Sequence, residues 1–338
     1  MAKAVIVGGT GQIGLALARD LVRDGWSVTI ASRSVSDIPP GCRHAIADAR
    51  DVAALRAGIG GECDLLVSCV AFDAADAAAL ADAGRDARHI VAISSISVYR
   101  DAEGRTLDEA PRCGFPDFVN PLTEDSPTIA PGDTSYSTRK IAMERTLFDQ
   151  AACPVTILRP GAIHGPDSKG AREWWFVKRL LDRRATIPLA YGGRSRFQTT
   201  SVAAIVDAVR RAAAGDLAAI ANVSDADCPS VAEIGQTIME IMGMKAELIG
   251  LADSISYPPA LGRNPWSLPR PMICSALATA PTTYRQSVGP AIDWLVRNVD
   301  NDNWRERLPH LAAYPGSLFD YDADDRAARL PDAVAIAG

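Results

Sequence analysis

Through the first half of the chain, short apolar runs alternate with amphipathic stretches. Ala4–Val7 is a continuous apolar run that ends at a glycine cluster, a pattern typical of a strand buried on both faces. From Ile13 to Asp24 the apolar residues recur at helical spacing, and the pattern stops at Gly25. The chain therefore opens with a predicted strand, a glycine turn and a helix.

The same alternation continues beyond this first unit. We predict further strands at Val28–Ala31, Leu65–Cys69, Ile90–Ser94 and Val155–Leu158, and helices at Asp51–Ala57, Ala74–Gly84 and Ser135–Gln150. Strands that alternate with helices predict a parallel sheet with crossover helices on both faces. The long segment from Tyr99 to Thr134 is rich in Pro, Gly and Asp, and connections of this length are usually functional loops.

After Pro160 the pattern changes to helices separated by proline-rich stretches. We predict helices at Glu173–Arg184, Ile205–Ala214, Val231–Met242 and Ala291–Asn298, no regular structure in Pro258–Pro271, and make no assignment for Met272–Ala280 or for the acidic tail from Asp300. No internal repeat or sharp linker is visible. We therefore expect a dinucleotide-binding domain over 1–165, with parts of 192–225, and an interleaved, mainly substrate-binding domain over 166–338.

Composition narrows the class of protein. The 338 residues are 48% hydrophobic and 22% charged, and a net charge of −6 argues against a nucleic-acid partner, which a basic surface would attract. No apolar run is long enough to span a bilayer, and the N-terminus lacks the features of a signal peptide. Seven cysteines without a C-x-x-C pair predict free thiols in a reducing compartment, so we expect a cytoplasmic protein. We also expect no metal-ligand cluster.

The glycine turn is the first motif that indicates chemistry. Its sequence is Gly8-Gly9-Thr10-Gly11-Gln12-Ile13-Gly14, between the first strand and the first helix. Glycines permit the tight turn and the close approach of backbone N–H groups to a pyrophosphate, which the positive end of the helix also favours. The strand–turn–helix context favours a dinucleotide site over a merely structural turn.

The end of the second strand bears on the choice of cofactor. A carboxylate there would bind the ribose 2′-hydroxyl of NAD, but the sequence places Ser32 and Arg33 there. An arginine fork suits a 2′-phosphate, so we predict NADP, with NAD as the alternative and a solvated surface arginine as the structural explanation. We place Asp48, after the next apolar run, beside the adenine amino group.

Two further motifs predict acid–base chemistry. Tyr136 and Lys140 are four residues apart on a predicted helix and so share a face, where an ammonium favours the ionised phenol. Such a tyrosine can exchange a proton near neutral pH. Ser95 follows the fourth strand, at the edge of a parallel sheet where active sites lie, although polar residues also end ordinary strands.

Together these residues resemble the extended short-chain dehydrogenase/reductase superfamily, the NAD(P)-dependent epimerase/dehydratase type, over most of residues 1–215. Two more strings carry the resemblance: Asn120–Pro127 is similar to its P-x-x-E-x-x-P segment, and Leu158–Pro166 to its L-R-P-x-x-x-Y-G-P segment. The resemblance implies a Rossmann-type doubly wound parallel sheet with a smaller, interleaved C-terminal substrate domain. It also suggests a homodimer.

The resemblance implies roles for individual residues. Ser95 would be the catalytic serine and Tyr136 the acid/base, both in contact with substrate, and Lys140 would activate Tyr136 and bind the nicotinamide ribose. The remaining cofactor contacts would come from Gly8, Thr10, Gly11, Gln12, Ile13, Gly14, Ser32, Arg33, Asp48, Cys69, Val70, Ala71, Pro160 and Ile163.

The chain departs from the family pattern where relatives bind nucleotide sugars. Ala162 replaces an asparagine and His164 a tyrosine, and Arg196 is one position out of register in the later substrate segment. His164 and Arg196 are candidate substrate contacts, and Trp174 and Trp175 would line an apolar pocket unless they simply pack in the core.

From these departures we rank three hypotheses about the function of the protein. The first is an NADP-dependent oxidoreductase that acts on the carbonyl or secondary alcohol of a non-nucleotide small molecule. The alternative is an NAD-dependent nucleotide-sugar epimerase or dehydratase. The third is a non-catalytic NADP-sensing protein, although such relatives often lose the tyrosine or lysine that this chain keeps.

Overall fold

A computed structural model of the protein describes residues 1–34, 37–252, 261–275 and 282–337. The chain divides into two compact units. The first contains Met1–Gly161, Val202–Ser224 and a short stretch that begins at Cys274. The second contains Ala162–Ser201, Asp225–Ile273 and Pro281–Gly338. Each unit is described by itself.

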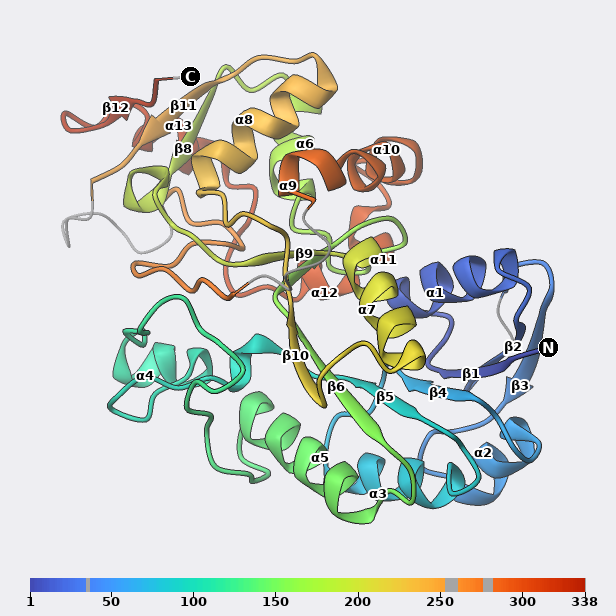
Figure 1. The fold of residues 1–338 in the computed structure, drawn as a ribbon. Helices are drawn as coiled ribbons and strands as arrows, with labels where there is room; N and C mark the ends of the chain where they lie inside the picture. The colour runs from blue at the N-terminus through green and yellow to red at the C-terminus, as the bar shows by residue number, and fades with distance from the viewer. Residues whose placement is uncertain (35–36, 253–260, 276–281, 338) are drawn as a thin grey trace. The chain divides into compact units, whose positions relative to one another are not determined.

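The first unit is built on a seven-stranded sheet (Figure 1). Its order is β10-β6-β5-β4-β1-β2-β3, and every pairing is parallel. The strands are β1 (Lys3–Val7), β2 (Ser27–Ser32), β3 (Cys42–Ile46), β4 (Leu65–Ser68), β5 (Ile90–Ile93), β6 (Val155–Pro160) and β10 (Ile220–Val223). Five of them are buried at almost every position, as parallel strands covered on both faces must be. The predicted doubly wound sheet is confirmed.

Helices cover both faces of this sheet. On one face α1 (Gln12–Arg23) packs against α7 (Val202–Ala214), and on the other α3 (Ala74–Ala83) packs against both α2 (Val52–Ile59) and α5 (Tyr136–Gln150). Between β5 and α5 the chain forms η1 (Ile96–Val98), and the long segment that follows forms η2 (Leu107–Glu109) and the short α4 (Ala110–Cys113). Every helix that the sequence predicts in this unit is present, with ends shifted by a few residues.

Two strands of the sheet are absent from the sequence prediction. The edge strand β3 reads Cys-Arg-His-Ala-Ile and is exposed or half-buried throughout, so it has no continuous apolar run to reveal it. Strand β10 is only four residues long and contains the polar Asn222. Strand patterns are weakest for short strands and for sheet edges, where burial is incomplete.

The second unit has a smaller and more irregular framework. Strands β7 (Ala162–His164) and β9 (Thr199–Ser201) pair in parallel, and β8 (Thr186–Leu189), β11 (Glu247–Gly250) and β12 (Val334–Ala335) form a three-stranded sheet. Its helical segments are α6 (Trp174–Leu181), η3 (Ala190–Gly193), α8 (Val231–Met242), α9 (Tyr284–Ser287), α10 (Gly289–Asn298), α11 (Trp304–Arg307), α12 (Pro309–Ala312) and α13 (Tyr321–Ala327).

The sequence analysis misses more of the second unit. The tail from Asp300 carries α11, α12, α13 and β12, which its acidic composition does not indicate. Of Pro258–Pro271, residues 261–271 contain no helix or strand, as predicted, and residues 258–260 lie outside the described part. Of Met272–Ala280, residues 272–275 carry isolated bridges and the others lie outside the described part.

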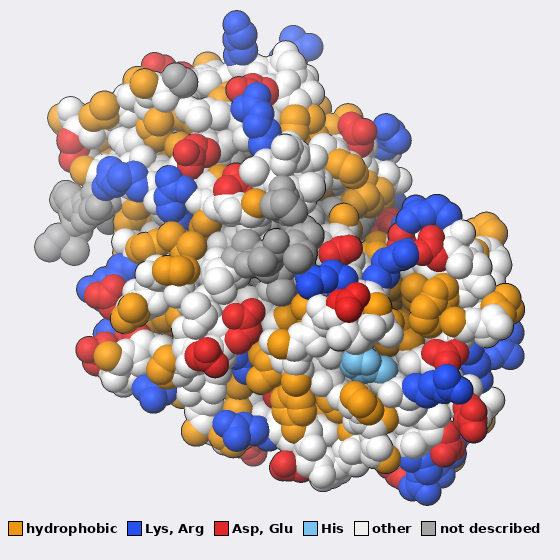
Figure 2. All heavy atoms as spheres, in the orientation of Figure 1, with side chains coloured by type: hydrophobic (Ala, Val, Ile, Leu, Met, Phe, Trp, Pro, Cys, Tyr) orange, Lys and Arg blue, Asp and Glu red, His pale blue; other side chains and the backbone are white. Residues whose placement is uncertain are grey.

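Charged side chains of both signs lie on the surface of this protein (Figure 2), whose net charge is −6. On the face drawn in Figure 2, basic and acidic side chains of the described residues are interspersed. Among the helices of the described ranges, none is both long enough and apolar enough to cross a membrane.

Candidate active site

The glycine turn lies at the carboxyl end of β1, where the strand order reverses. Strand β1 pairs with β2 on one side and β4 on the other. Gly8 has a φ of 77°, which a side chain would strain, and its N–H donates to the Ala31 carbonyl at 2.9 Å. A Cβ on Gly14 would lie 2.3 Å from the Cα of Gly9. Glycine is therefore required where α1 starts against the turn.

The turn fits a pyrophosphate on three structural grounds. Gly11 is the N-cap of α1 and supplies no side chain to cap the helix, and the first turn contains no acidic residue. The first turn of α1 thus brings neither a capping side chain nor a carboxylate to the positive end of the helix. A Cβ on Gly11 would meet only the Gly8 carbonyl, at 3.6 Å, so the backbone here is open to close approach. Thr10, Gln12 and Ile13 complete the turn and the helix start.

The carboxyl end of β2 holds no carboxylate. Ser32 is 9% exposed, and its hydroxyl donates to the Ser34 carbonyl at 3.0 Å and lies 2.7 Å from Nε2 of His44 on β3. Arg33 is exposed. Asp48 is also exposed, and it accepts a hydrogen bond from the Arg50 backbone at 2.9 Å. The sequence analysis did not single out His44, because its strand was not recognised.

The segment after β4 lies beside the glycine turn. A Cβ on Gly8 would lie 2.3 Å from the Val70 side chain, which is 45% exposed. The Ala71 N–H donates to the Ser68 hydroxyl at 3.0 Å and so fixes the turn that follows the strand. Burial raises the pKa of Cys69 to about 12, which excludes a thiolate at neutral pH.

Ser95, Tyr136 and Lys140 come together at this same edge of the sheet. Ser95 caps η1, accepting from the Ser97 N–H at 3.1 Å, and its side chain is hydrogen-bonded to Tyr136. Ser135 caps α5 in a capping box with Thr138, so Tyr136 opens the helix. Lys140 is one turn later, with Nζ 5.9 Å from the centre of the Tyr136 ring.

The environment of Lys140 favours loss of its charge. Burial lowers the pKa of Lys140 to about 8, and the carboxylate of Glu144 opposes that shift. The ammonium donates to the backbone carbonyls of Ala71, at 2.8 Å, and Ile93, at 2.9 Å. These bonds join α5 to the ends of β4 and β5.

Tyr136 differs from the expectation of an ionised phenol. Removal from solvent raises the pKa of Tyr136, the Ser95 hydrogen bond opposes the rise, and the carboxylate of Asp108 adds to it. Lys140 does not offset this rise in the pKa of Tyr136. The tyrosine is therefore a protonated acid at neutral pH in this structure, and its ring is 39% exposed, which leaves it accessible to a substrate.

Two neighbours of Tyr136 were not found from the sequence. The Phe72 ring centre lies 5.4 Å from that of Tyr136 and 5.8 Å from Nζ of Lys140. Asp108 accepts from the Ser137 N–H at 2.7 Å, next to the start of α5. Both come from irregular segments whose course the sequence pattern does not predict.

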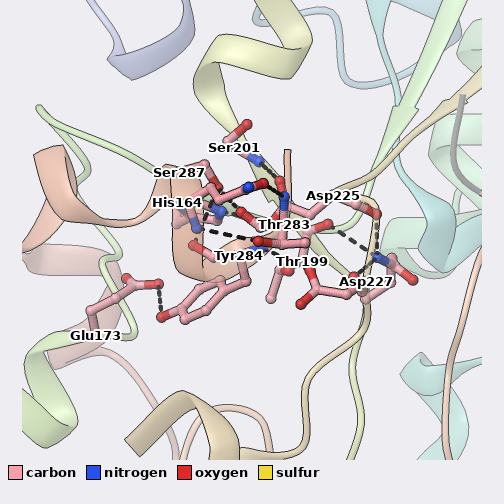
Figure 3. A network of polar contacts seen from close by, with 11 residues as sticks. His164, Glu173, Thr199, Ser201, Asp225, Asp227, Thr283, Tyr284 and Ser287 are labelled. Carbon is pink, nitrogen blue, oxygen red and sulfur yellow. Dashed lines mark hydrogen bonds and ion pairs between the residues drawn. The ribbon is translucent and has the colours of Figure 1, made fainter. Parts of the chain in front are cut away.

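His164 belongs to a buried polar network in the second unit (Figure 3). It is 1% exposed, and its Nε2 lies 2.8 Å from Oδ2 of Asp225. Its ring meets the edge of Tyr284, with centroids 5.0 Å apart, and Tyr284 donates to Glu173 at 3.5 Å. Such burial is typical of a structural role, and a direct contact between His164 and a substrate stays a prediction.

Trp174 and Trp175 are core residues. Both are 0% exposed and lie within the main hydrophobic cluster of the second unit. Trp175 also stacks on the guanidinium of Arg179, 3.7 Å from the ring centre. The structure thus places the pair in the core, the alternative left open above.

Arg196 lines a pocket of about 300 Å³ that lies wholly in the second unit. Its guanidinium donates to the Cys228 carbonyl and pairs with Glu233 at 3.2 Å. Arg285, also at the pocket, pairs with Glu240 at 2.7 Å, and Asp227 adds a third carboxylate. Both cations are therefore already matched by protein anions.

The two predicted nicotinamide contacts fall in different units. Pro160 is the last residue of β6, at the carboxyl edge of the large sheet. Ile163 is the half-buried middle residue of β7 in the second unit. The described geometry brings Ser95, Tyr136, Lys140 and Ala71 together, and the role of Ile163 stays a prediction.

The fold and this edge of the sheet define a Rossmann-type dinucleotide-binding protein. The family model for the NAD dependent epimerase/dehydratase family matches residues 4–223, so the chain belongs to that family. It is accordingly an NAD(P)-dependent enzyme of the extended short-chain dehydrogenase/reductase type.

Solved structures agree with this at the level of the fold. A UDP-galactose 4-epimerase is 20% identical, with a TM-score of 0.63 over 88% of this chain and 100% of that one. A UDP-N-acetylglucosamine 4-epimerase from Bacillus cereus is 17% identical, with a TM-score of 0.67 over 89% of this chain and 98% of that one. A dTDP-glucose 4,6-dehydratase from Bacillus anthracis str. Ames in complex with NAD is 15% identical, with a TM-score of 0.65 over 91% of this chain and 100% of that one. No curated protein matches.

Proposed function

We propose that the enzyme transfers a hydride between a nicotinamide cofactor and a carbon that carries a hydroxyl or carbonyl oxygen, with Tyr136 as the acid/base. The observation that carries this proposal is the Ser95–Tyr136–Lys140 cluster beside the glycine turn. A bound nicotinamide supplies or accepts the hydride. The protein supplies the proton and holds the reacting oxygen.

Each residue of the cluster has a separate task. The Tyr136 hydroxyl donates its proton to a carbonyl oxygen that becomes an alcohol, and in the reverse direction it takes the proton back. Ser95, hydrogen-bonded to Tyr136, holds the same substrate oxygen. Lys140, with a pKa of about 8, stabilises the phenolate that the donation leaves behind.

Replacement of Tyr136 tests this mechanism. Tyr136→Phe should lower kcat by about 10²–10⁴-fold, the usual contribution of a positioned acid/base, while cofactor affinity stays within twofold. Phe148→Ala, a second half-exposed aromatic residue on α5, is the matched control and should retain turnover. Full turnover in Tyr136→Phe would contradict the mechanism.

We propose a nucleotide sugar as the substrate. The support comes from the family and from three structural relatives whose names specify UDP or dTDP sugars. This proposal departs from the non-nucleotide substrate that the sequence favoured, which the comparisons do not support. An epimerase or dehydratase oxidises and re-reduces its substrate, so it would convert UDP-glucose or dTDP-glucose without net consumption of cofactor.

One observation favours the second candidate, a non-nucleotide carbonyl compound. In the pocket that contains Arg196, two arginines face three carboxylates, so a diphosphate would meet a site without excess positive charge. Incubation of the enzyme with nucleotide sugars distinguishes the two. Conversion with catalytic cofactor supports the first candidate, and stoichiometric loss of NADPH absorbance with small ketones or aldehydes supports the second.

We propose NADP as the preferred cofactor. The support is the serine–arginine pair at the end of β2, where an NAD enzyme would place a carboxylate. The alternative is NAD, with which the dTDP-glucose 4,6-dehydratase described above is in complex. Binding titrations of NADPH and NADH distinguish them: NADPH should bind at least tenfold more tightly, and Arg33→Ala should remove most of that difference, as expected for the loss of a charge-assisted contact.

A further inference from the structure

His44 lies on the same side of the sheet as the glycine turn. It is paired in register with Ile30 on β2, so the two side chains share a face. The glycine turn covers that face, because a Cβ on Gly9 would lie 2.8 Å from the Ile30 side chain. Ser32 is two residues beyond Ile30 and therefore faces the same way. His44 thus stands beside the residue that occupies the ribose-binding position.

The Ser32 hydroxyl lies within hydrogen-bond distance of two groups. It is 3.0 Å from the Ser34 carbonyl, which can only accept, and 2.7 Å from Nε2 of His44, which donates or accepts according to the tautomer of the ring. In the tautomer that carries the proton on Nε2, His44 donates to Ser32, and the serine hydroxyl keeps its own proton for an acceptor. His44 therefore acts on a group bound at the end of β2 through the Ser32 hydroxyl, which it holds in place.

We propose that His44 is a specificity-determining residue for the 2′-phosphate of NADP, acting with Ser32 and Arg33. The proposal rests on the NADP preference proposed above. Phosphate oxygens accept hydrogen bonds, and charge-assisted bonds of this kind are about twice as strong as neutral ones. NADH carries only a neutral 2′-hydroxyl in this position, which forms weaker hydrogen bonds with the same donors than a phosphate does. The loss of His44 should therefore weaken NADPH binding selectively.

The same strand offers a matched control. Arg43 precedes His44, and its guanidinium also donates to a side chain of β2, the Thr29 hydroxyl, at 2.9 Å. Arg43 is paired in register with Thr29, one position from Ile30, and so lies on the opposite face of the sheet. Arg43→Gln removes a comparable β2–β3 link away from the glycine turn.

The experiment is a fluorescence titration of the full chain with NADPH and NADH, repeated by competition with adenosine 2′,5′-bisphosphate and AMP. His44→Leu should weaken NADPH and the bisphosphate by about tenfold, the value of a hydrogen bond to a charged group, and leave NADH and AMP within twofold. His44→Gln, which keeps an N–H donor, should recover part of the loss. Arg43→Gln should change none of the four, and a thermal melt of each variant reports folding.

Three results would overturn the inference, each for a distinct reason. If His44→Leu weakens NADPH and NADH equally, His44 only supports the strand edge. If Arg33→Ala lowers the NADPH preference and His44→Leu does not, the NADP proposal stands and the role of His44 fails. If the unsubstituted protein binds NADPH and NADH equally, the proposed cofactor preference fails as well.

Discussion

Two buried polar networks, one in each unit, differ in how completely their hydrogen bonds are satisfied. The first network consists of Ser94, Tyr99, Glu144, Arg159 and Asn222 in the first unit. The second network consists of His164, Glu173, Thr199, Asp225 and Tyr284 in the second. All ten side chains are at most 4% exposed. The difference in hydrogen bonding between the two networks therefore does not arise from a difference in solvent exposure.

In the first network every polar side-chain atom has a partner within the protein. Arg159 donates to both carboxylate oxygens of Glu144, at 3.0 and 2.6 Å, and to the Tyr99 hydroxyl at 3.2 Å. Ser94 donates to Glu144 at 2.5 Å, and Tyr99 donates to Asn222 at 2.7 Å. A buried charge pair needs such full satisfaction to offset its desolvation.

In the second network several polar atoms have no partner within the protein. These are Nδ1 of His164, Oε2 of Glu173 and Oγ1 of Thr199. Asp225 is the best-satisfied member, since it accepts from His164 at 2.8 Å and from the Ser201 N–H at 2.9 Å. Burial raises the pKa of Glu173, with His164 opposing, so its neutral form is favoured.

The positions of the networks explain the difference. The first links β5, β6, β10 and α5 directly behind Ser95 and Lys140, and Glu144 acts on the pKa of Lys140. Fixed geometry is useful there because proton transfer depends on it. The second ties β7 and β9 to α9 and the start of α6. Because several of its polar atoms have no partner, the second network restrains its side chains less than the first network does.

Breaking the first network should have the largest effect. Arg159→Met leaves the Glu144 carboxylate buried without its cation and should lower the free energy of unfolding by about 3–5 kcal/mol. Chemical denaturation measures this loss. Arg297→Met, which breaks an exposed pair with Asp293, should cost less than about 1 kcal/mol. An Arg159→Met loss as small as that of the control would show that the network is not a strong restraint.

Breaking the second network should have a smaller effect. His164→Phe keeps a ring against Tyr284 but removes the donor to Asp225, which retains the Ser201 N–H. The expected loss is about 1–3 kcal/mol, the cost of one unsatisfied buried acceptor, in part offset by removal of the unpaired Nδ1. The same denaturation experiment measures it. A loss larger than that of Arg159→Met would reverse the comparison.

The contrast also shows what a sequence can predict. The glycine turn, the strand ends and the Tyr136–Lys140 spacing are local patterns, and they led to the correct sheet and to one compact cluster of side chains. Phe72 and Asp108 reach that cluster from two irregular segments, and His44 reaches Ser32 from an edge strand; none of these segments carries a periodicity that would place them. Both networks join residues more than a hundred positions apart, as in Tyr99–Asn222 and Glu173–Tyr284. No local pattern predicts such pairings.

His164 illustrates the limit most clearly. In the sequence it is a lone histidine beside glycine and proline, a candidate substrate contact although such residues are more often structural. Only the fold brings it to Asp225, 61 residues later, and closes both off from solvent. Trp174 and Trp175 are similar, because an aromatic run fits a pocket wall and a core equally well until its neighbours are known.

The smallest effect, and the one most specific to the second network, is expected at Glu173. Its pKa is raised in the folded protein, so above the unfolded value the folded state retains a proton that the unfolded state has lost. Stability from this group is therefore fully present at low pH and declines as pH rises from the unfolded pKa towards the folded one. Glu173→Gln removes that decline, and its stability relative to the unsubstituted protein should rise between pH 5 and pH 8, by about 1 kcal/mol per unit of pKa shift.

Denaturation curves at both pH values measure the Glu173 effect, and Glu233→Gln is the control. Glu233 is a partly exposed capping residue whose pKa is lowered: burial acts to raise it, but hydrogen bonds from Ser230 and the charge of Arg196 outweigh that. Its contribution has the opposite sign, present above the unfolded pKa and lost as pH falls. If Glu173→Gln and Glu233→Gln follow the same pH trend, Glu173 is not held in its neutral form. The second network would then contain a buried negative charge at Glu173.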